Sequence, residues 1–282
     1  MTVTGTINYM DRATVNPTTW YIPPPAGVPV DNVILDPREV EIADLRDIGH
    51  GLEPLRDGLA PVRLETNFTA FDDDEAVLRD LVPQMIAIAR GLFGRDKVFY
   101  FDHAVRRRPA VAPRPDELRK GGTVRAPLHR AHCDYTPASA RAYLEQRLGE
   151  PARELAGHRV RIVNFWRPIV GPLRDDPLAI CLPGSLSPDD LEPIHHIYAE
   201  GAEADIYGLH WNPGHRWFTM SDMMPEDAYC FTLYDSGRPE APVAPHTAFA
   251  LRNAPEPVPP RASFEFRLAI YDDAPADLTK AH

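Results

Sequence analysis

Short apolar runs separated by polar turns occur along most of the chain, and this pattern favours many short β-strands. The 31 prolines are spread between these runs, at about twice the usual frequency, and are not collected in one linker. Residues 97–107 give the clearest strand, because Val98, Phe99, Tyr100 and Phe101 are β-branched or aromatic. Further strands are predicted at 158–169, 227–236 and 261–272, and a hairpin is predicted at 205–223 around the turn sequence NPGH.

Two longer segments carry the spacing and the end signals of helices. Residues 72–94 begin with acidic residues and end at a glycine, with apolar residues every three or four positions. Pro83 should kink or restart this helix. Residues 136–149 begin with Thr136 as N-cap and a proline in the first helical position. The same cap-then-proline signature predicts a short helix at 187–194.

Together these elements predict a mainly β protein with flanking helices, built on a double-stranded β-helix core of the jelly-roll or cupin-like kind. We expect residues 1–282 to form a single domain, because no repeat or low-complexity tract marks a boundary. Within it, residues 1–95 are expected to form an N-terminal wrapping segment and helix, and residues 96–275 the jelly-roll core.

Composition narrows the classes of function. The net charge is −11, with 30 Lys and Arg against 41 Asp and Glu, which argues against a nucleic-acid partner and favours a small-molecule substrate. No apolar run of roughly 18 residues and no signal-peptide pattern occurs, so we expect no membrane partner and a cytoplasmic location. The three cysteines lie far apart, which is typical of a reducing compartment.

The segment LHRAHCDYTP, residues 128–137, concentrates reactive side chains. On an extended chain His132 and Asp134 leave the same face, about 6 to 7 Å apart at Cα, which suits two ligands of one metal, and Cys133 points the other way. This geometry disfavours a thiolate nucleophile at Cys133. His129 is a rival ligand, and a polar loop would explain an HxD sequence equally well.

A distant histidine strengthens the metal hypothesis. His246 stands among apolar residues in the sequence APHTAF, shortly before the strand predicted at 261–272. Two histidines and one carboxylate on one face of a β-scaffold form the facial triad of non-haem Fe(II) oxygenases. That triad leaves three coordination positions open, two for an oxo-acid and one for O₂. His132, Asp134 and His246 are therefore candidate metal ligands and catalytic residues.

A dicarboxylate co-substrate needs a second, distant anchor, and a guanidinium offers a planar fork for it. Arg261 and Ser263 alternate onto one face of their strand, and Arg267 falls on the same face. Either arginine is a candidate anchor, although ion pairs with Glu265 would also explain them.

Two residues of the strand at 158–169 are candidates for the wall of a cofactor pocket. Asn164 and Trp166 share one face of that strand. A tryptophan in a strand is nevertheless more often a core residue. His195 and His196 fall in a stretch expected to be helical, where adjacent side chains point to different faces, and we assign them no function.

From about Phe99 to Tyr271 the sequence resembles the hydroxylase/desaturase family that includes the cephamycin-pathway methoxylation component and fungal gibberellin desaturases. These enzymes are similar to Fe(II)/2-oxoglutarate-dependent dioxygenases. The motifs that carry the resemblance follow in the expected order: FDHAVRR, HCDYTP, RIVNFWRP, NPGHRWF, PHTAF and RASFEFR. The first 95 residues match only loosely. The sequence LAICLPGSL departs from the family, in which an acidic or polar residue tends to follow the cysteine, and this leaves the substrate contacts open.

The resemblance implies that His132, Asp134 and His246 bind Fe(II), and that Arg261 and Ser263 hold the 2-oxoglutarate carboxylate. It also implies O₂ as a co-substrate and the hydroxylation, desaturation or oxidative cyclisation of a small natural-product or amino-acid-derived substrate. The presence of Asp134 argues against a halogenase, because halogenases leave the carboxylate position vacant for a halide.

Two other classes of function stay open. One is a non-redox metal-dependent isomerase or hydrolase on a cupin-like barrel, in which a metal activates water. The other is a ligand-binding jelly roll without catalytic activity. The oligomeric state is equally open.

Overall fold

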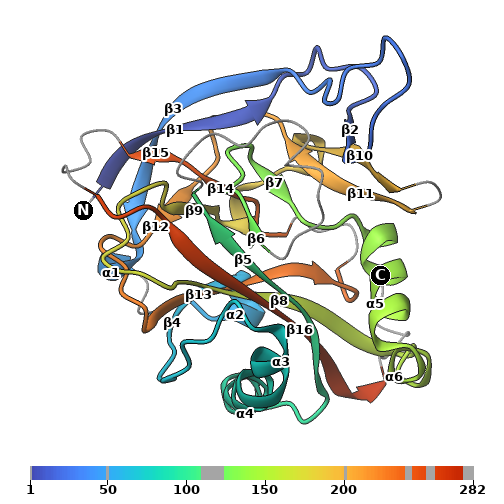
Figure 1. The fold of residues 1–282 in the computed structure, drawn as a ribbon, viewed down its shortest axis with the longest axis vertical. Helices are drawn as coiled ribbons and strands as arrows, with labels where there is room; N and C mark the ends of the chain where they lie inside the picture. Colours follow the sequence, from blue (N-terminus) through green and yellow to red (C-terminus); the bar gives the residue numbers. More distant parts are fainter. Residues whose placement is uncertain are drawn as a thin grey trace.

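The computed structural model describes residues 2–48, 51–108, 124–199, 202–238, 243–251 and 258–275. Within these residues two β-sheets face each other, and helices lie at the outside (Figure 1). The larger sheet contains, from edge to edge, β15 (Ala250–Leu251), β1 (Thr2–Met10), β3 (Leu35–Asp44), β12 (Trp217–Thr219), β9 (Leu178–Cys181), β14 (His246–Ala248), β7 (His132–Cys133), β11 (Ala202–Leu209), β10 (Leu191–Ala199) and β2 (Thr18–Trp20). The smaller sheet contains β4 (Leu59–Arg63), β13 (Asp227–Asp235), β8 (His158–Pro168), β16 (Ala262–Pro275), β5 (Val98–Arg107) and β6 (Val124–Arg125).

The helices are short and flank the sheets. They are α1 (Leu45–Ile48), α2 (Pro54–Asp57), α3 (Asp74–Ala76), the π-helix η2 (Val77–Leu81), α4 (Val82–Phe93), α5 (Pro137–Leu148), α6 (Glu150–Glu154) and the 3₁₀ turns η3 (Pro183–Ser185) and η4 (Pro188–Asp190). Among the described residues, no helix is long and apolar enough to cross a membrane. The predicted mainly β, jelly-roll fold with flanking helices is confirmed.

Strand alternation in the smaller sheet divides the interior into two cores. Ile162 and Trp166 of β8 face the larger sheet, where they pack with Leu178, Ile180 and other residues of the core between the sheets. Phe165 of the same strand faces outward and packs with the apolar side chains of α4. Asn164 has the inward parity of Ile162 and Trp166, so it points between the sheets.

The segments with the strongest patterns form the predicted elements. The strands expected at 97–107, 158–169, 227–236 and 261–272 are β5, β8, β13 and β16. The helix expected at 72–94 is interrupted by a π-helical turn immediately before Pro83, and α4 restarts there, as the proline predicts.

Two expected elements are wrong. At 187–194 the cap-and-proline signal produces only the 3₁₀ turn η4, because the chain from Leu191 onward pairs with β11 and β2 as strand β10. At 205–223 a turn does form at Asn212–His215, but its flanking strands do not pair with each other. Strand β11 pairs with β10 and β7, whereas β12 pairs with β3 and β9. Tertiary pairing therefore overrides the local signals.

The first 95 residues contribute β1, β2 and β3 to the larger sheet and β4 to the smaller one, in addition to helices. Strand β1 pairs with β3 along nine residues. The division of the chain at residue 95 stays a prediction.

The cap of α5 gives a test of the local fold. Thr136 Oγ1 accepts a hydrogen bond from the Ser139 backbone N–H at 3.2 Å, and Ser139 Oγ accepts one from the Thr136 N–H at 2.9 Å. Thr136→Ala should lower the free energy of unfolding by about 1 kcal/mol, because one buried N–H loses its partner. Urea unfolding measures this loss. Gln146→Ala, on the exposed side of the same helix, should stay within about 0.5 kcal/mol of the parent. Equal effects of the two substitutions would show that the cap contributes nothing.

Candidate metal centre

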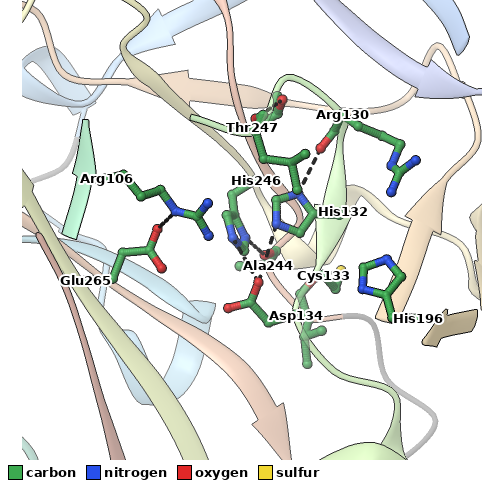
Figure 2. Close-up of polar contacts among 12 residues, drawn as sticks. Arg106, Arg130, His132, Cys133, Asp134, His196, Ala244, His246, Thr247 and Glu265 are labelled. Carbon is green, nitrogen blue, oxygen red and sulfur yellow. Dashed lines mark hydrogen bonds and ion pairs between the residues drawn. The ribbon is translucent and has the colours of Figure 1, made fainter. Parts of the chain in front are cut away.

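Three side chains from distant parts of the sequence meet on the inner face of the larger sheet (Figure 2). Strands β7 and β14 are antiparallel neighbours in which His132 lies directly opposite His246, so both rings leave the same face. Their ring centroids are 4.4 Å apart. Asp134 follows β7 with the same parity as His132. One ligand atom from each residue lies within 4.8 Å of the others.

Backbone carbonyl groups fix the orientation of both rings. His132 Nδ1 lies 2.8 Å from the Arg130 carbonyl oxygen, and His246 Nδ1 lies 3.2 Å from the Ala244 carbonyl oxygen. Because each Nδ1 donates its proton there, each Nε2 keeps its lone pair. The two Nε2 atoms lie 3.4 and 3.5 Å from Asp134 Oδ1. Two imidazole nitrogens and one carboxylate oxygen therefore converge, a donor set that fits a divalent first-row metal.

Arg267 of β16 holds the other oxygen of this carboxylate. Its Nη2 and Nε lie 2.9 and 3.1 Å from Asp134 Oδ2. Burial favours the neutral acid, but the charge of Arg267 outweighs it and lowers the pKa of Asp134 well below its usual range. The carboxylate is thus ionised, with Oδ2 held by Arg267 and Oδ1 directed at the histidines.

A second carboxylate continues this buried network. Glu265 forms ion pairs with Arg267, at 2.5 Å, and with Arg106 of β5. Burial favours its neutral form, but the charges of Arg106 and Arg267 lower the pKa of Glu265 to about 2. Charges therefore alternate in sign from Arg106 through Glu265 and Arg267 to Asp134 (the Arg106–Glu265 end is drawn in Figure 2). Ion pairs with Glu265 are one explanation of the arginines in the strand at 261–272. The pair of Arg267 with Glu265 is present and buried, and Arg267 also contacts Asp134 of the candidate metal site.

Arg261 and Ser263 lie on the same inward face. Arg261 Nε donates to Ser263 Oγ at 3.3 Å, and Nη1 donates to the Asp176 carbonyl oxygen at 2.5 Å. Burial and the neighbouring charge of Arg106 lower the pKa of Arg261 to about 10, so it stays charged at neutral pH. A pocket between the sheets joins Arg261 to the two candidate histidine ligands; its lining consists of Arg106, Leu128, His132, Leu178, His246, Thr247, Ala248, Arg261 and Glu265.

Asn164 and Trp166 are fully buried on the inner face of the smaller sheet and are not among the residues that line this pocket. Both amide atoms of Asn164 and the Trp166 Nε1 have no hydrogen-bond partner among the described residues. In the sheet Asn164 lies between Arg267, which contacts Asp134, and Phe231, whose ring centroid is 4.9 Å from that of His246. The guanidinium of Arg261 stacks over the Trp166 ring at 5.0 Å. Trp166 is thus both a core residue and a platform for Arg261.

The structure separates the rival candidates from the site. His129 is 41% exposed and pairs with Asp176 at 3.2 Å. Cys133 is fully buried on the opposite face from His132, and burial raises its pKa well above the usual range, so the thiol stays protonated. His195 pairs with acidic side chains at the surface.

Sequence reasoning missed Arg106, Thr247 and His196. Arg106 and Thr247 line the pocket, and His196 lies on the inner face of β10. Arg106 lies directly opposite Ser263 in the paired strands β5 and β16. The sequence alone does not show which strands pair, so it does not reveal this position. The expected helix at 195–197 concealed His196, because only strand alternation turns it inward and His195 outward.

Comparisons with known proteins match almost the whole chain. A family model described as "Oxidoreductase/YMDC permease-like domain" matches residues 7–271. A relative named Fe(II)/2-oxoglutarate-dependent dioxygenase nvfI, from Aspergillus novofumigatus, is 28% identical over 93% of each chain. The hydroxylase/desaturase efuI from Hormonema carpetanum is 28% identical over 77% of each chain.

Solved structures with the same fold are also found. One, named iron and alpha-ketoglutarate-dependent endoperoxidase NvfI, superimposes with a TM-score of 0.82. It is 24% identical in sequence, and the match covers 96% of this chain and 98% of that one. The arrangement of the two sheets is therefore shared over nearly the full length.

Arg267→Lys tests whether the guanidinium fork positions Asp134. Lysine keeps the charge but cannot hold Oδ2 with two N–H groups in a fixed plane. We expect the affinity for Co(II), measured by competition with a chelator, to fall by about 10- to 100-fold. Arg161→Lys is the matched control, because Arg161 is also buried and paired, with Asp235 and Asp272, on the opposite face of β8 from Asn164. It should lower stability without changing metal affinity. Equal metal affinity in both variants would contradict the positioning role.

Proposed function

The chain belongs to the family described as oxidoreductase/YMDC permease-like domain, and from this premise we propose that it is an Fe(II)- and 2-oxoglutarate-dependent oxygenase. The observation that carries the proposal is the convergence of two histidine nitrogens and one carboxylate oxygen on the inner face of a jelly roll. Such a facial set leaves the remaining coordination positions of a metal open to other ligands. The names of the curated relatives, which are dioxygenases and hydroxylase/desaturases, support the same class.

His132, Asp134 and His246 are the proposed iron ligands. Fe(II) held by these residues would supply the activation of O₂, with electrons from 2-oxoglutarate, which would become succinate and CO₂ as a substrate C–H bond is oxidised. The protein fixes the two Nε2 atoms through carbonyl groups and the Oδ1 atom through Arg267. The three donor atoms are thus held close together by contacts that do not involve a metal.

Arg261 and Ser263 are the proposed anchor for the far carboxylate of 2-oxoglutarate. The alternative, Arg267, is already paired with Asp134 and Glu265. Arg261 lines the same pocket as the two histidines, and its side-chain hydrogen bonds are made to neutral oxygen atoms. A buried guanidinium without a paired carboxylate would form a strong, charge-assisted hydrogen bond with an incoming carboxylate.

Asn164 and Trp166 complete the proposed co-substrate pocket. An unpaired buried amide costs about 1 to 3 kcal/mol, and a bound oxygen atom would supply its missing partner. The Trp166 ring lies under the Arg261 guanidinium, with Cζ 5.0 Å from the ring centroid.

The proposed primary substrate is a small natural-product or amino-acid-derived molecule, and the reaction is a hydroxylation, desaturation or oxidative cyclisation. A cytoplasmic location stays a prediction. A non-redox isomerase or hydrolase has no support in the names of the relatives.

Optical spectroscopy tests the iron site directly. Under anaerobic conditions the Fe(II)-loaded protein should develop a weak visible charge-transfer band when 2-oxoglutarate is added, and His246→Ala should abolish the band because the metal loses a ligand. His215→Ala is the matched control, since this buried histidine bonds to Asp190 and Tyr9 and not to the triad. The proposal fails if the parent shows no band and consumes no 2-oxoglutarate with any substrate. Metal-dependent turnover without oxygen uptake would favour the isomerase or hydrolase.

Arg261→Lys tests the co-substrate anchor. Titration of the same band should require about 10- to 100-fold more 2-oxoglutarate, because one charged hydrogen-bonding fork is lost. Iron binding should not change. Arg167→Lys is the control, because Arg167 is a buried arginine stacked on Phe71, on the other face of β8. An unaltered titration midpoint in Arg261→Lys would refute the anchor.

A further inference from the structure

A second group of buried polar side chains lies on the inner face of the larger sheet, beyond the candidate metal site. Strand β11 pairs with β7 on one side and with β10 on the other. Cys133 of β7 is opposite Tyr207 of β11, so Asp134, the next residue, comes to the level of Ile206. Ile206 is opposite Ile194 of β10, and His196 is the next residue along β10 with the same parity. Its Cα therefore lies about 12 Å from that of Asp134, two strand spacings across and two residues along. Figure 2 shows the His196 ring beside the segment that carries His132 and Asp134.

His196 is a polar group without a full set of partners. Its side chain is 3% exposed, and its Nε2 atom has no hydrogen-bond partner among the described residues. The other nitrogen, Nδ1, lies 3.2 Å from the Tyr198 hydroxyl oxygen. When that hydroxyl donates to Nδ1, the ring proton is on Nε2, which becomes a donor directed into the protein interior. Burial and the charge of Arg130 lower the pKa of His196 to about 3, so the ring is neutral.

Arg130 brings a cation to the same place. Its guanidinium reaches across to β2, where Nη2 lies 3.5 Å from Thr19 Oγ1, and Thr19 is the register partner of His196. The Arg130 side chain is 8% exposed and pairs with Asp31, which is 40% exposed. Its Nε has no hydrogen-bond partner among the described residues. A neutral imidazole donor and a buried guanidinium therefore face one region.

Aromatic rings form the wall of this region. The Tyr21 and Tyr198 rings are stacked, with centroids 4.8 Å apart, and Tyr21 meets the His196 ring edge-on at 5.2 Å. Burial raises the pKa of Tyr21, and the charge of Asp31 raises it further. The positive charges of Arg130, Arg125 and Arg106 lower it. Positive charges therefore outnumber negative ones around Tyr21, whereas Tyr198 lies near one arginine, Arg125, and one carboxylate, Asp134.

We propose that His196, Arg130, Tyr21 and Tyr198 form the subsite for the primary substrate, and that this substrate is a carboxylate on a flat, apolar or aromatic skeleton. The His196 Nε2 proton and the Arg130 guanidinium bind the carboxylate, and the stacked tyrosines pack against the skeleton. The subsite rests on the proposed oxygenase function for its role in a reaction, but its ligand binding does not require the metal. Proximity to Asp134 places the skeleton beside the candidate iron ligands.

Cinnamate is a suitable probe because it combines a carboxylate with a flat ring. Calorimetry on the full-length, metal-free protein should show binding of cinnamate, and cinnamamide, which lacks the charge, should bind about tenfold more weakly or worse. His196→Phe should weaken cinnamate binding about tenfold or more. Excess 2-oxoglutarate should leave the cinnamate affinity unchanged, because the co-substrate pocket is separate.

His195→Phe is the matched control. It changes the adjacent residue of the same strand, whose side chain faces outward and pairs with Glu203 and Asp205, and it should leave cinnamate binding unaltered. Should His196→Phe fail to fold, Tyr198→Phe decides, because it removes only the hydroxyl that orients His196 and should weaken binding by roughly three- to tenfold.

The proposal is overturned by any of four results: no cinnamate binding to the parent protein, equal losses in His195→Phe and His196→Phe, unchanged affinity in Tyr198→Phe, or displacement of cinnamate by 2-oxoglutarate. These outcomes are independent of the iron site, which the charge-transfer band tests separately. A protein with an intact band and no cinnamate binding keeps its oxygenase function and loses only this subsite.

Discussion

The ion pair between Arg267 and Asp134 is the contact on which the candidate site depends. It joins the two sheets at the point where the histidines of β7 and β14 converge, and it occupies only one oxygen of the carboxylate. A carboxylate free to rotate would present either oxygen, or both, to a metal. Because Arg267 holds Oδ2, Oδ1 is the atom that faces the two Nε2 nitrogens, and the geometry of the donor set is fixed before any metal binds.

Buried ion pairs of this kind cost desolvation energy that their mutual attraction often fails to recover. The network from Arg106 through Glu265 and Arg267 to Asp134 is therefore weak evidence for stability and stronger evidence for a site. The same inward face carries Arg261, stacked on Trp166, and the unpaired amide of Asn164. Apolar side chains in these positions would cost less free energy to bury. The charged and polar residues are therefore best explained by the ligands that they are arranged to bind.

Much of this site follows from alternation along single strands. The parity of His132 and Asp134, and of Arg261, Ser263 and Arg267, correctly places each set on one face. What a single strand does not reveal is its neighbours. His132 pairs with His246, and Arg267 contacts Asp134, which makes Arg267 unavailable as the co-substrate anchor. The residues of each pair lie more than a hundred positions apart in sequence.

The wrong expectations have the same cause. A cap-and-proline signal at 187–194 and a turn sequence at 205–223 are correct as local signals, because a 3₁₀ turn and a tight turn form there. Pairing with β11, β7, β3 and β9 decided what followed each turn. The helix expected around His196 concealed a side chain that strand geometry directs inward.

The most direct test of the central claim is anomalous diffraction at the iron absorption edge, from crystals grown anaerobically with Fe(II). We expect one strong peak in contact with Nε2 of His132, Nε2 of His246 and Oδ1 of Asp134, with Arg267 still bonded to Oδ2. A peak elsewhere, or iron bound through Oδ2 with Arg267 displaced, would contradict it.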